Sequence, residues 1–249
     1  MNFPDSLLNK IVESKQLLFF TGAGVSAESG IETFRGKGGM WHKYSATDLA
    51  TPEAFERNPN LVWEWYQHRR KKVRAAKPNS GHYAIAEFEK LFNSVSVVTQ
   101  NVDNLHNRAG STDVIELHGN IEKNFCSDCG KRFDFITFEE INKVPKCDEC
   151  AGNIRPDVVW FGEQLPEEAF RLANYKATSC DICFVVGTSA IVYPAALIPE
   201  TARRAGAVLV EINIEKTNLS DLADYSLIGK SGEILLNLLT KIKNIKRAI

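Results

Sequence analysis

Four cysteines of the chain have the spacing of metal ligands. They form two C-x-x-C pairs separated by seventeen residues, Cys126 with Cys129 and Cys147 with Cys150. Each pair offers two thiolates from one tight turn, and two such pairs complete a closed tetrahedral site for zinc. Because a closed site has no open position for water, we expect this zinc ion to be structural. Cys180 and Cys183 share the spacing but flank an apolar segment, so we interpret them as core residues.

A glycine-rich turn near the N-terminus has the spacing of a dinucleotide-binding loop. It reads Gly22-Ala23-Gly24-Val25-Ser26-Ala27, directly after an apolar segment, and fits G-x-G-x-x-A. Such glycines let the backbone approach a phosphate, and a following helix offers free N–H donors. A dehydrogenase would carry an acidic residue about 20 positions further on, at the end of a second strand. Residues 41–49 show no strand pattern, which disfavours a standard dehydrogenase; a tight turn that merely requires glycine is the plainer alternative.

Polar side chains follow a second apolar segment. Residues 99–106 read TQNVDNLH, and residues 116–120 read ELHGN. Amides and carboxylates are costly to bury without partners, so we expect them to face a cleft. His106 and His118 are the candidates for proton transfer in this region, and a histidine that is merely buried or exposed is the alternative for each.

Apolar runs indicate the elements that must position these residues. Short apolar segments bounded by turn residues predict four buried strands at Gln16–Thr21, Ser94–Thr99, Ile182–Val186 and Ala207–Ile212. Helical patterns lie between them, for example at 194–205 and 232–243. Apolar strands with ligand-type residues at their carboxyl ends are typical of an α/β fold with a doubly wound, Rossmann-like parallel sheet.

Two long excursions interrupt this α/β series, a mostly helical one and one that contains the four metal-type cysteines. We therefore expect a smaller lobe made of a helical insertion, 33–90, and a zinc ribbon, 122–155. The Rossmann-like large domain then comprises 1–32, 91–121 and 156–249, and the whole chain, 1–249, forms a single catalytic unit.

Composition excludes several classes of function. The 249 residues carry 30 Lys+Arg against 31 Asp+Glu and are 44% hydrophobic, as in an ordinary globular protein. A net charge of −1 gives no field to hold the protein on nucleic acid or anionic lipid. No apolar run approaches the ~20 residues that span a bilayer, and no signal-peptide pattern is present. We expect a cytoplasmic protein with reduced cysteines that binds neither nucleic acid nor membrane.

Taken together, these motifs resemble those of the sirtuins, NAD-dependent protein-lysine deacylases. The resemblance runs in family order from about residue 16 to 232 and rests on the following segments: residues 22–31 with Phe34-Arg35, residues 99–103, Leu117-His118-Gly119, the four cysteines, residues 158–163 and Gly187-Thr188-Ser189. It implies that NAD is consumed as a co-substrate with an acylated lysine of a protein or peptide. The products would be nicotinamide, O-acyl-ADP-ribose and free lysine.

The resemblance also implies a role for particular residues. His118 would be the general base. Residues implied to bind NAD are Gly22, Ala23, Gly24, Ser26, Phe34, Arg35, Trp41, Gln100, Asn101, Asp103, Gly187, Thr188, Ser189, Asn213 and Ser231. The substrate backbone would pair as an added strand with Val159, Trp160, Phe161, Gly162 and Glu163.

Tyr66 and Arg69 are three residues apart in a helical segment and hence share one face. They resemble the Tyr-x-x-Arg pair of the bacterial and mitochondrial class III subgroup, which removes malonyl, succinyl or glutaryl groups. A guanidinium holds a carboxylate through two hydrogen bonds, and a phenol adds one donor. A solvated basic face is the alternative for this segment. The alternatives for the whole protein are a plain deacetylase, a mono-ADP-ribosyltransferase, and an NAD-dependent oxidoreductase suggested by the glycine turn alone. A zinc-ribbon module that binds nucleic acid is a further alternative, which the surplus of acidic residues between Cys126 and Cys150 disfavours.

Overall fold

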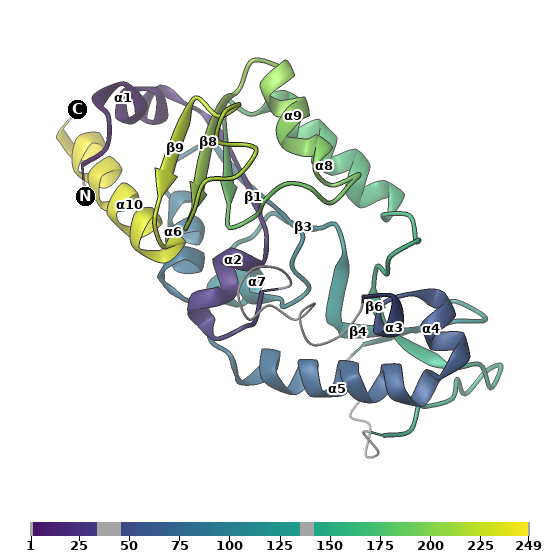
Figure 1. Ribbon diagram of the computed structural model, residues 1–249. Coiled ribbons are helices and arrows are strands. Elements are labelled where there is room, and N and C mark those ends of the chain that lie inside the picture. The colour runs from purple at the N-terminus through teal and green to yellow at the C-terminus, as the bar shows by residue number, and fades with distance from the viewer. Residues whose placement is uncertain (1, 34–45, 135–141, 249) are drawn as a thin grey trace.

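The main sheet is parallel and has six strands. The computed structural model describes residues 2–33, 46–134 and 142–248 (Figure 1). The strand order is β3-β2-β1-β7-β8-β9, with these bounds: β1 Gln16–Thr21, β2 Ser94–Thr99, β3 Val114–Glu116, β7 Ile182–Val186, β8 Val208–Asn213 and β9 Tyr225–Ile228. The chain builds outward from β1 in one direction and from β7 in the other. The order therefore reverses between β1 and β7, the place where open α/β sheets bind ligands.

Helices cover both faces of this sheet. In Figure 1, α1 (Asp5–Glu13), α6 (Ser80–Phe88) and α10 (Ser231–Ala248) lie on one side, and α8 (Glu167–Ser179) and α9 (Leu197–Arg204) on the other. Successive strand residues point to opposite faces, so Phe19 joins the core under α6 and α10, while Phe20 joins the core under α8 and α9. Because both faces are buried, the strands read as continuous apolar runs.

A smaller antiparallel sheet has the order β5-β4-β6, formed by β4 (Gly119–Cys126), β5 (Arg132–Asp134) and β6 (Ile154–Val158). Three helices adjoin it: α3 (Ala46–Leu49), α4 (Pro52–Arg57) and α5 (Pro59–Ala75). Asn58 caps α5 through the backbone N–H of Leu61. Buried Arg70 joins α5 to β4, because it donates to the Ile121 carbonyl and the Asn124 amide oxygen, both at 2.7 Å.

The sequence-based fold prediction is confirmed. Three predicted strands have their predicted bounds, and β8 begins and ends one residue later than expected. The helix expected after the glycine turn is the short α2 (Ala23–Ser26), which continues into a 3₁₀ turn at Ala27–Ser29. The helix α7 (Leu105–Ala109) begins next to His106, where the sequence indicates a helix start. No helix within the three described ranges is both long and apolar enough to cross a lipid bilayer.

Candidate functional site

A cavity of about 550 Å³ lies at the carboxyl edge of β1, β2, β7 and β8 and extends to α5 and the loop after β6. Predicted residues that line it are Gly22, Ala23, Gly24, Tyr66, Arg69, Gln100, Asn101, His118, Val159, Trp160, Phe161, Gly162, Glu163, Gly187, Thr188, Ser189, Asn213 and Ser231. Ser26 and Asp103 are buried behind the lining. Phe34, Arg35 and Trp41 lie outside the described residues. The cavity thus brings together side chains from segments far apart in the sequence.

The two glycines of the N-terminal turn bring two chain segments into contact. Gly24 donates its N–H to the Gly187 carbonyl at 2.8 Å, and Gly22 donates to the Val186 carbonyl at 3.0 Å. A Cβ at Gly24 would lie 2.7 Å from the Gly187 Cα, and one at Gly22 would lie 2.6 Å from the Thr188 Cβ. Glycine is therefore required here by the close approach of the turns after β1 and β7.

A buried polar network fixes the side chain of Asn101. Its Nδ2 donates to the Gly22 carbonyl and to Ser26 Oγ, both at 3.1 Å. Ser26 Oγ in turn donates to Asp103 Oδ2 at 2.7 Å, and the Leu105 N–H donates to Asp103 Oδ1 at 2.9 Å. Burial raises the pKa of Asp103, against the effect of these hydrogen bonds. Ser26 and Asp103 thus hold Asn101 at the cavity wall.

His118 occupies the turn between β3 and β4 and borders the cavity. Its Nδ1 lies 3.0 Å from the Gln100 carbonyl oxygen, which can only accept a proton. Nδ1 is therefore the protonated nitrogen of the neutral ring, and Nε2 carries the lone pair. Burial lowers the pKa of His118, although the hydrogen bond to Gln100 opposes this shift. The ring is consequently neutral at pH 7 and suited to accept a proton.

His106, the other candidate for proton transfer, lies outside the cavity lining and is buried. Its Nε2 is 2.9 Å from Thr21 Oγ1, which donates to Thr99 Oγ1 at 2.8 Å. Its ring also lies 4.8 Å from that of buried His82, a residue that the sequence analysis missed. Burial, together with His82, holds the pKa of His106 well below its usual value. These two histidines belong to the protein interior.

A second missed residue, Glu211, organises the far end of the cavity. It is fully buried in β8 and accepts hydrogen bonds from Thr217 Oγ1 and Ser220 Oγ at 2.5 Å and from Ser226 Oγ at 2.7 Å. Thr217 lines the cavity, as Asn213 does just after Glu211 in the chain. The sequence gives no signal of this role, because the hydroxyls come from later parts of the chain: Thr217 and Ser220 from the segment after β8, and Ser226 from β9.

The other end of the cavity is aromatic and cationic. Tyr66 and Trp160 are buried, and the Trp160 Nε1 donates to the Tyr66 hydroxyl at 2.9 Å. The Arg69 guanidinium carbon lies 4.7 Å from the centre of the Trp65 ring and 5.3 Å from that of Tyr66. Burial lowers the pKa of Arg69, and the attraction to Tyr66 opposes the shift. One face of α5 therefore presents a phenol and a guanidinium to the cavity, as the three-residue spacing predicts.

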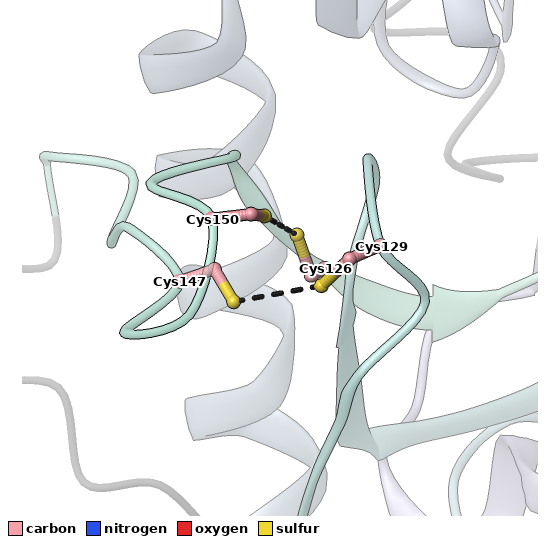
Figure 2. Close-up of side chains that lie close together, drawn as sticks. All are labelled: Cys126, Cys129, Cys147 and Cys150. Atoms are coloured by element: carbon pink, nitrogen blue, oxygen red, sulfur yellow. Dashed lines mark hydrogen bonds between the residues drawn. The ribbon is translucent and has the colours of Figure 1, made fainter.

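The four predicted metal ligands converge (Figure 2). Their sulfur atoms all lie within 4.8 Å of one another, with 3.4 Å between Cys126 and Cys150 and 3.7 Å between Cys129 and Cys147. A tetrahedral zinc ion with Zn–S bonds of about 2.3 Å separates its sulfurs by about 3.8 Å. A Cβ at position 152 would lie 2.8 Å from the Cys126 sulfur, so Gly152 leaves room for the cluster. The residues fit a structural zinc ion.

Comparisons with known proteins agree with this architecture. The model of the Sir2 family matches residues 22–194. An NAD-dependent protein deacylase of Pyrococcus furiosus is 50% identical over 95% of this chain and 97% of its own length. NAD-dependent protein deacylase 2 of Pyrobaculum aerophilum is 50% identical over 98% of this chain and 96% of its own length.

Solved structures show the same fold. A Sir2 homologue in complex with NAD has a TM-score of 0.93 at 45% identity and covers 98% of this chain and 95% of its own. A complex of Sir2 with a p53 peptide and NAD⁺ has a TM-score of 0.87 at 34% identity and covers 97% of this chain and 98% of its own. The chain therefore belongs to the Sir2 family.

Proposed function

We propose that the protein is an NAD-dependent protein-lysine deacylase. The observation that carries the proposal is the neutral His118 ring, whose Nδ1 is engaged by Gln100 and which lines the same cavity as the glycine turn and the loop after β6. The Pyrococcus and Pyrobaculum relatives are named as enzymes of this activity. An oxidoreductase is not favoured, since the family assignment accounts for the glycine turn without hydride transfer.

The cavity residues divide into two groups in this proposal. Gly22, Ala23 and Gly24 would contact the pyrophosphate of NAD, and Gln100 and Asn101 would surround its nicotinamide ribose, with Ser26 and Asp103 behind them. Gly187, Thr188, Ser189, Asn213 and Ser231 would contact the adenosine half. Phe34, Arg35 and Trp41 keep the NAD-binding role implied by the family resemblance.

The reaction needs a base at one defined atom. NAD supplies a ribose carbon that is open to attack when nicotinamide leaves, and the acyl oxygen of the lysine amide is the nucleophile. His118 Nε2 would accept the proton of a ribose hydroxyl as that hydroxyl attacks the acyl carbon. The carbon–nitrogen bond to the lysine would then break, and one water molecule would add at the acyl carbon. The acyl group would remain as an ester on ADP-ribose, and the lysine amine would leave with the proton.

The loop after β6 would hold the substrate backbone, but with fewer free N–H donors than an unpaired strand edge offers. Four of the five N–H groups in residues 159–163 already donate within the chain: Val159 to His118, Trp160 to Glu163, Phe161 to Ala50 and Glu163 to Trp160. The substrate would therefore find chiefly carbonyl acceptors on this loop and supply the N–H donors itself.

The acyl preference is a finer part of the proposal. Tyr66 and Arg69 would bind the terminal carboxylate of a succinyl or malonyl group, as in the class III subgroup that these residues resemble. A carboxylate that enters the cavity loses water, and a guanidinium compensates through a charge-assisted pair. A plain deacetylase, or a mono-ADP-ribosyltransferase, is the alternative.

The zinc ion would be structural. Its four cysteines connect the β4–β5 turn to the chain before β6, on the far side of β4 from His118. Our division into a large domain, 1–32, 91–121 and 156–249, and a lobe of 33–90 and 122–155 remains part of the proposal for one catalytic unit.

One experiment separates these activities. Peptides of one sequence carrying acetyl-, malonyl-, succinyl- or glutaryl-lysine are incubated with and without NAD and followed by mass spectrometry. We expect NAD-dependent loss of the acyl mass, with O-acyl-ADP-ribose and nicotinamide formed in equal amounts. A gain of ADP-ribose mass on the peptide would instead indicate a transferase, and absence of any NAD-dependent change would refute the proposal.

A further inference from the structure

One hydrogen bond connects the loop after β6 to the aromatic end of the cavity. Trp160 Nε1 lies 2.9 Å from the Tyr66 hydroxyl oxygen, although the two residues are 94 positions apart. Both side chains are almost completely buried, at 2% and 1% exposure. A buried bond of fixed length between two stiff rings holds each ring in place.

The chemistry of the two groups gives this bond a direction. An indole N–H can only donate, so the Tyr66 oxygen accepts and its own proton points elsewhere. The neighbouring guanidinium of Arg69 also has donors only and cannot take this proton. Tyr66 borders the cavity, so its O–H is left to donate to a group that enters there. Burial raises the pKa of Tyr66, which keeps the phenol protonated at neutral pH.

Trp160 is itself held by an ion pair. Its backbone N–H donates to Glu163 Oε2 at 2.7 Å. Arg155 donates to both oxygens of Glu163, at 2.5 and 3.0 Å, and to the Val158 carbonyl at 3.0 Å. The Arg155 guanidinium carbon lies 3.2 Å from the centre of the Trp160 ring. Arg155 is buried, whereas Glu163 is partly exposed and borders the cavity. Glu163 thus holds the backbone of Trp160, and the Arg155 guanidinium holds the face of its indole ring.

We propose that Trp160 is a positioning residue for acyl specificity, whose indole N–H orients the Tyr66 hydroxyl as a donor toward the polar end of the acyl group. The inference rests on the proposed function, since it assumes that the acyl group occupies the part of the cavity next to Tyr66. It adds that the loop after β6 acts on acyl choice through Tyr66, beyond its pairing with the substrate backbone.

A double-mutant cycle tests this coupling. Trp160→Phe removes the N–H and keeps an aromatic ring, and Tyr66→Phe removes the hydroxyl. The kcat and KM values are measured for succinyl- and acetyl-lysine peptides of one sequence with the wild type, both single variants and the double variant. We expect Trp160→Phe to lower the succinyl-to-acetyl ratio of kcat/KM by about 3- to 10-fold, the weight of one hydrogen bond, chiefly through KM. In the Tyr66→Phe background the same substitution should lower the ratio no further.

Two controls separate the hydrogen bond from packing. Phe55→Leu alters a ring 5.3 Å from that of Trp160 without touching the bond, and should leave the acyl ratio as in the wild type. Replacement of Trp160 by 3-benzothienylalanine keeps the bicyclic shape without the N–H, and decides the question if Trp160→Phe does not fold. Both Trp160 replacements should also raise the pKa of Tyr66 in a spectroscopic titration, since the indole stabilises the phenolate.

The outcomes distinguish this inference from the proposed function. A wild-type enzyme with no preference for succinyl over acetyl peptide overturns the acyl assignment and this inference together. A wild-type preference that both Trp160 replacements leave intact overturns this inference alone. This inference alone is also overturned if Trp160→Phe lowers the succinyl-to-acetyl ratio equally in the wild-type and Tyr66→Phe backgrounds, because Trp160 would then act independently of Tyr66.

Discussion

His118 Nδ1 lies 3.0 Å from the Gln100 carbonyl oxygen, and this contact leaves Nε2 as the basic nitrogen of the ring. The Val159 N–H donates to the His118 carbonyl at 3.0 Å, and the next residue, Gly119, packs closely against the Asp157 carbonyl, so the backbone that leaves His118 is fixed. His118 was one of two histidines that the sequence offered for proton transfer, and the family motif favoured it over His106; the structure supplies a tautomer and an orientation that suit a base.

We predict that His118→Ala lowers the rate of deacylation by about 10²- to 10⁴-fold, the usual effect of losing a general base. Because burial lowers the pKa of His118, the activity of the wild type should fall only when the pH drops below about 6.5. Rates of O-acyl-ADP-ribose formation across pH 5–8 measure both effects. Unchanged melting temperature and zinc content would show that the variant is folded, and wild-type turnover by that variant would exclude His118 as the base.

Stability should fall in mild acid because of buried His82. Burial lowers the pKa of this residue to about 4, so between pH 6.5 and 4 the unfolded chain takes up a proton that the folded protein excludes. The free energy of unfolding therefore decreases as pH falls, by roughly 2 kcal/mol for this group between pH 7 and 5. Urea titrations at pH 7 and pH 5 measure this free energy of unfolding, and its decrease should be smaller in His82→Gln than in the wild type. Zinc content is measured at each pH, since loss of metal would also destabilise the protein, and identical pH dependence in both proteins would contradict the assignment.

The main sheet could be predicted because its strands are buried on both faces. Runs such as that containing Phe19 and Phe20 then lack alternation and stand out from the helices. Strands β3 and β9 have only three and four residues at the edges of the sheet, too few for a pattern. The cysteine cluster was predictable for a different reason, since both ligand pairs are local in the sequence.

The buried contacts behind the cavity could not be predicted. Asp103 follows a strand as a cofactor ligand would, but it turns away to accept the hydrogen bond of Ser26, 77 positions earlier. Glu211 appears in the sequence as an isolated acid in an apolar strand, and its three hydroxyl partners come from two later segments. Such partners are determined by tertiary packing, which neither periodicity nor a motif records.

Removal of one cysteine should release the metal. We predict that Cys126→Ala abolishes stoichiometric zinc binding and lowers the melting temperature by several degrees, because folding of a small metal-binding sheet is coupled to its metal. The matched control is Cys180→Ala, a partly buried cysteine outside the cluster, which should retain zinc. Metal analysis and thermal unfolding measure both variants. A metal-free Cys126→Ala protein with the wild-type melting temperature would contradict a structural role.

The glycine after His118 should be irreplaceable. Gly119 has φ +77°, and a Cβ there would lie 2.1 Å from the Asp157 carbonyl oxygen. Gly119→Ala must therefore shift the backbone that carries His118, and we predict loss of most activity together with a lower melting temperature. Gly110 also has positive φ, +101°, but open space around its Cα. Gly110→Ala should lower the free energy of unfolding only by the strain of that conformation, about 1–2 kcal/mol, and should retain activity. Comparable activity in the Gly119→Ala and Gly110→Ala variants would show that the contact with Asp157 can relax.

Arg69 should decide acyl preference through charge. A succinyl carboxylate must lose water to enter the cavity, and a charge-assisted hydrogen-bonded pair with the guanidinium, worth about 1.5–3 kcal/mol, offsets that cost. We predict that Arg69→Met lowers the succinyl-to-acetyl ratio of kcat/KM by about 10- to 100-fold, mainly by raising KM for the succinyl peptide. For Arg69→Lys this ratio should lie between those of the wild type and Arg69→Met, because an ammonium keeps the charge but cannot form the bidentate hydrogen bonds of a guanidinium. Arg74→Met, on the same helix but paired with Glu122 on β4, is the matched control and should leave the ratio unchanged. Steady-state kinetics on both peptides measure all three variants. Equal losses on the two substrates would mark Arg69 as a structural residue of α5, and the enzyme would then be a deacetylase without preference for acidic acyl groups.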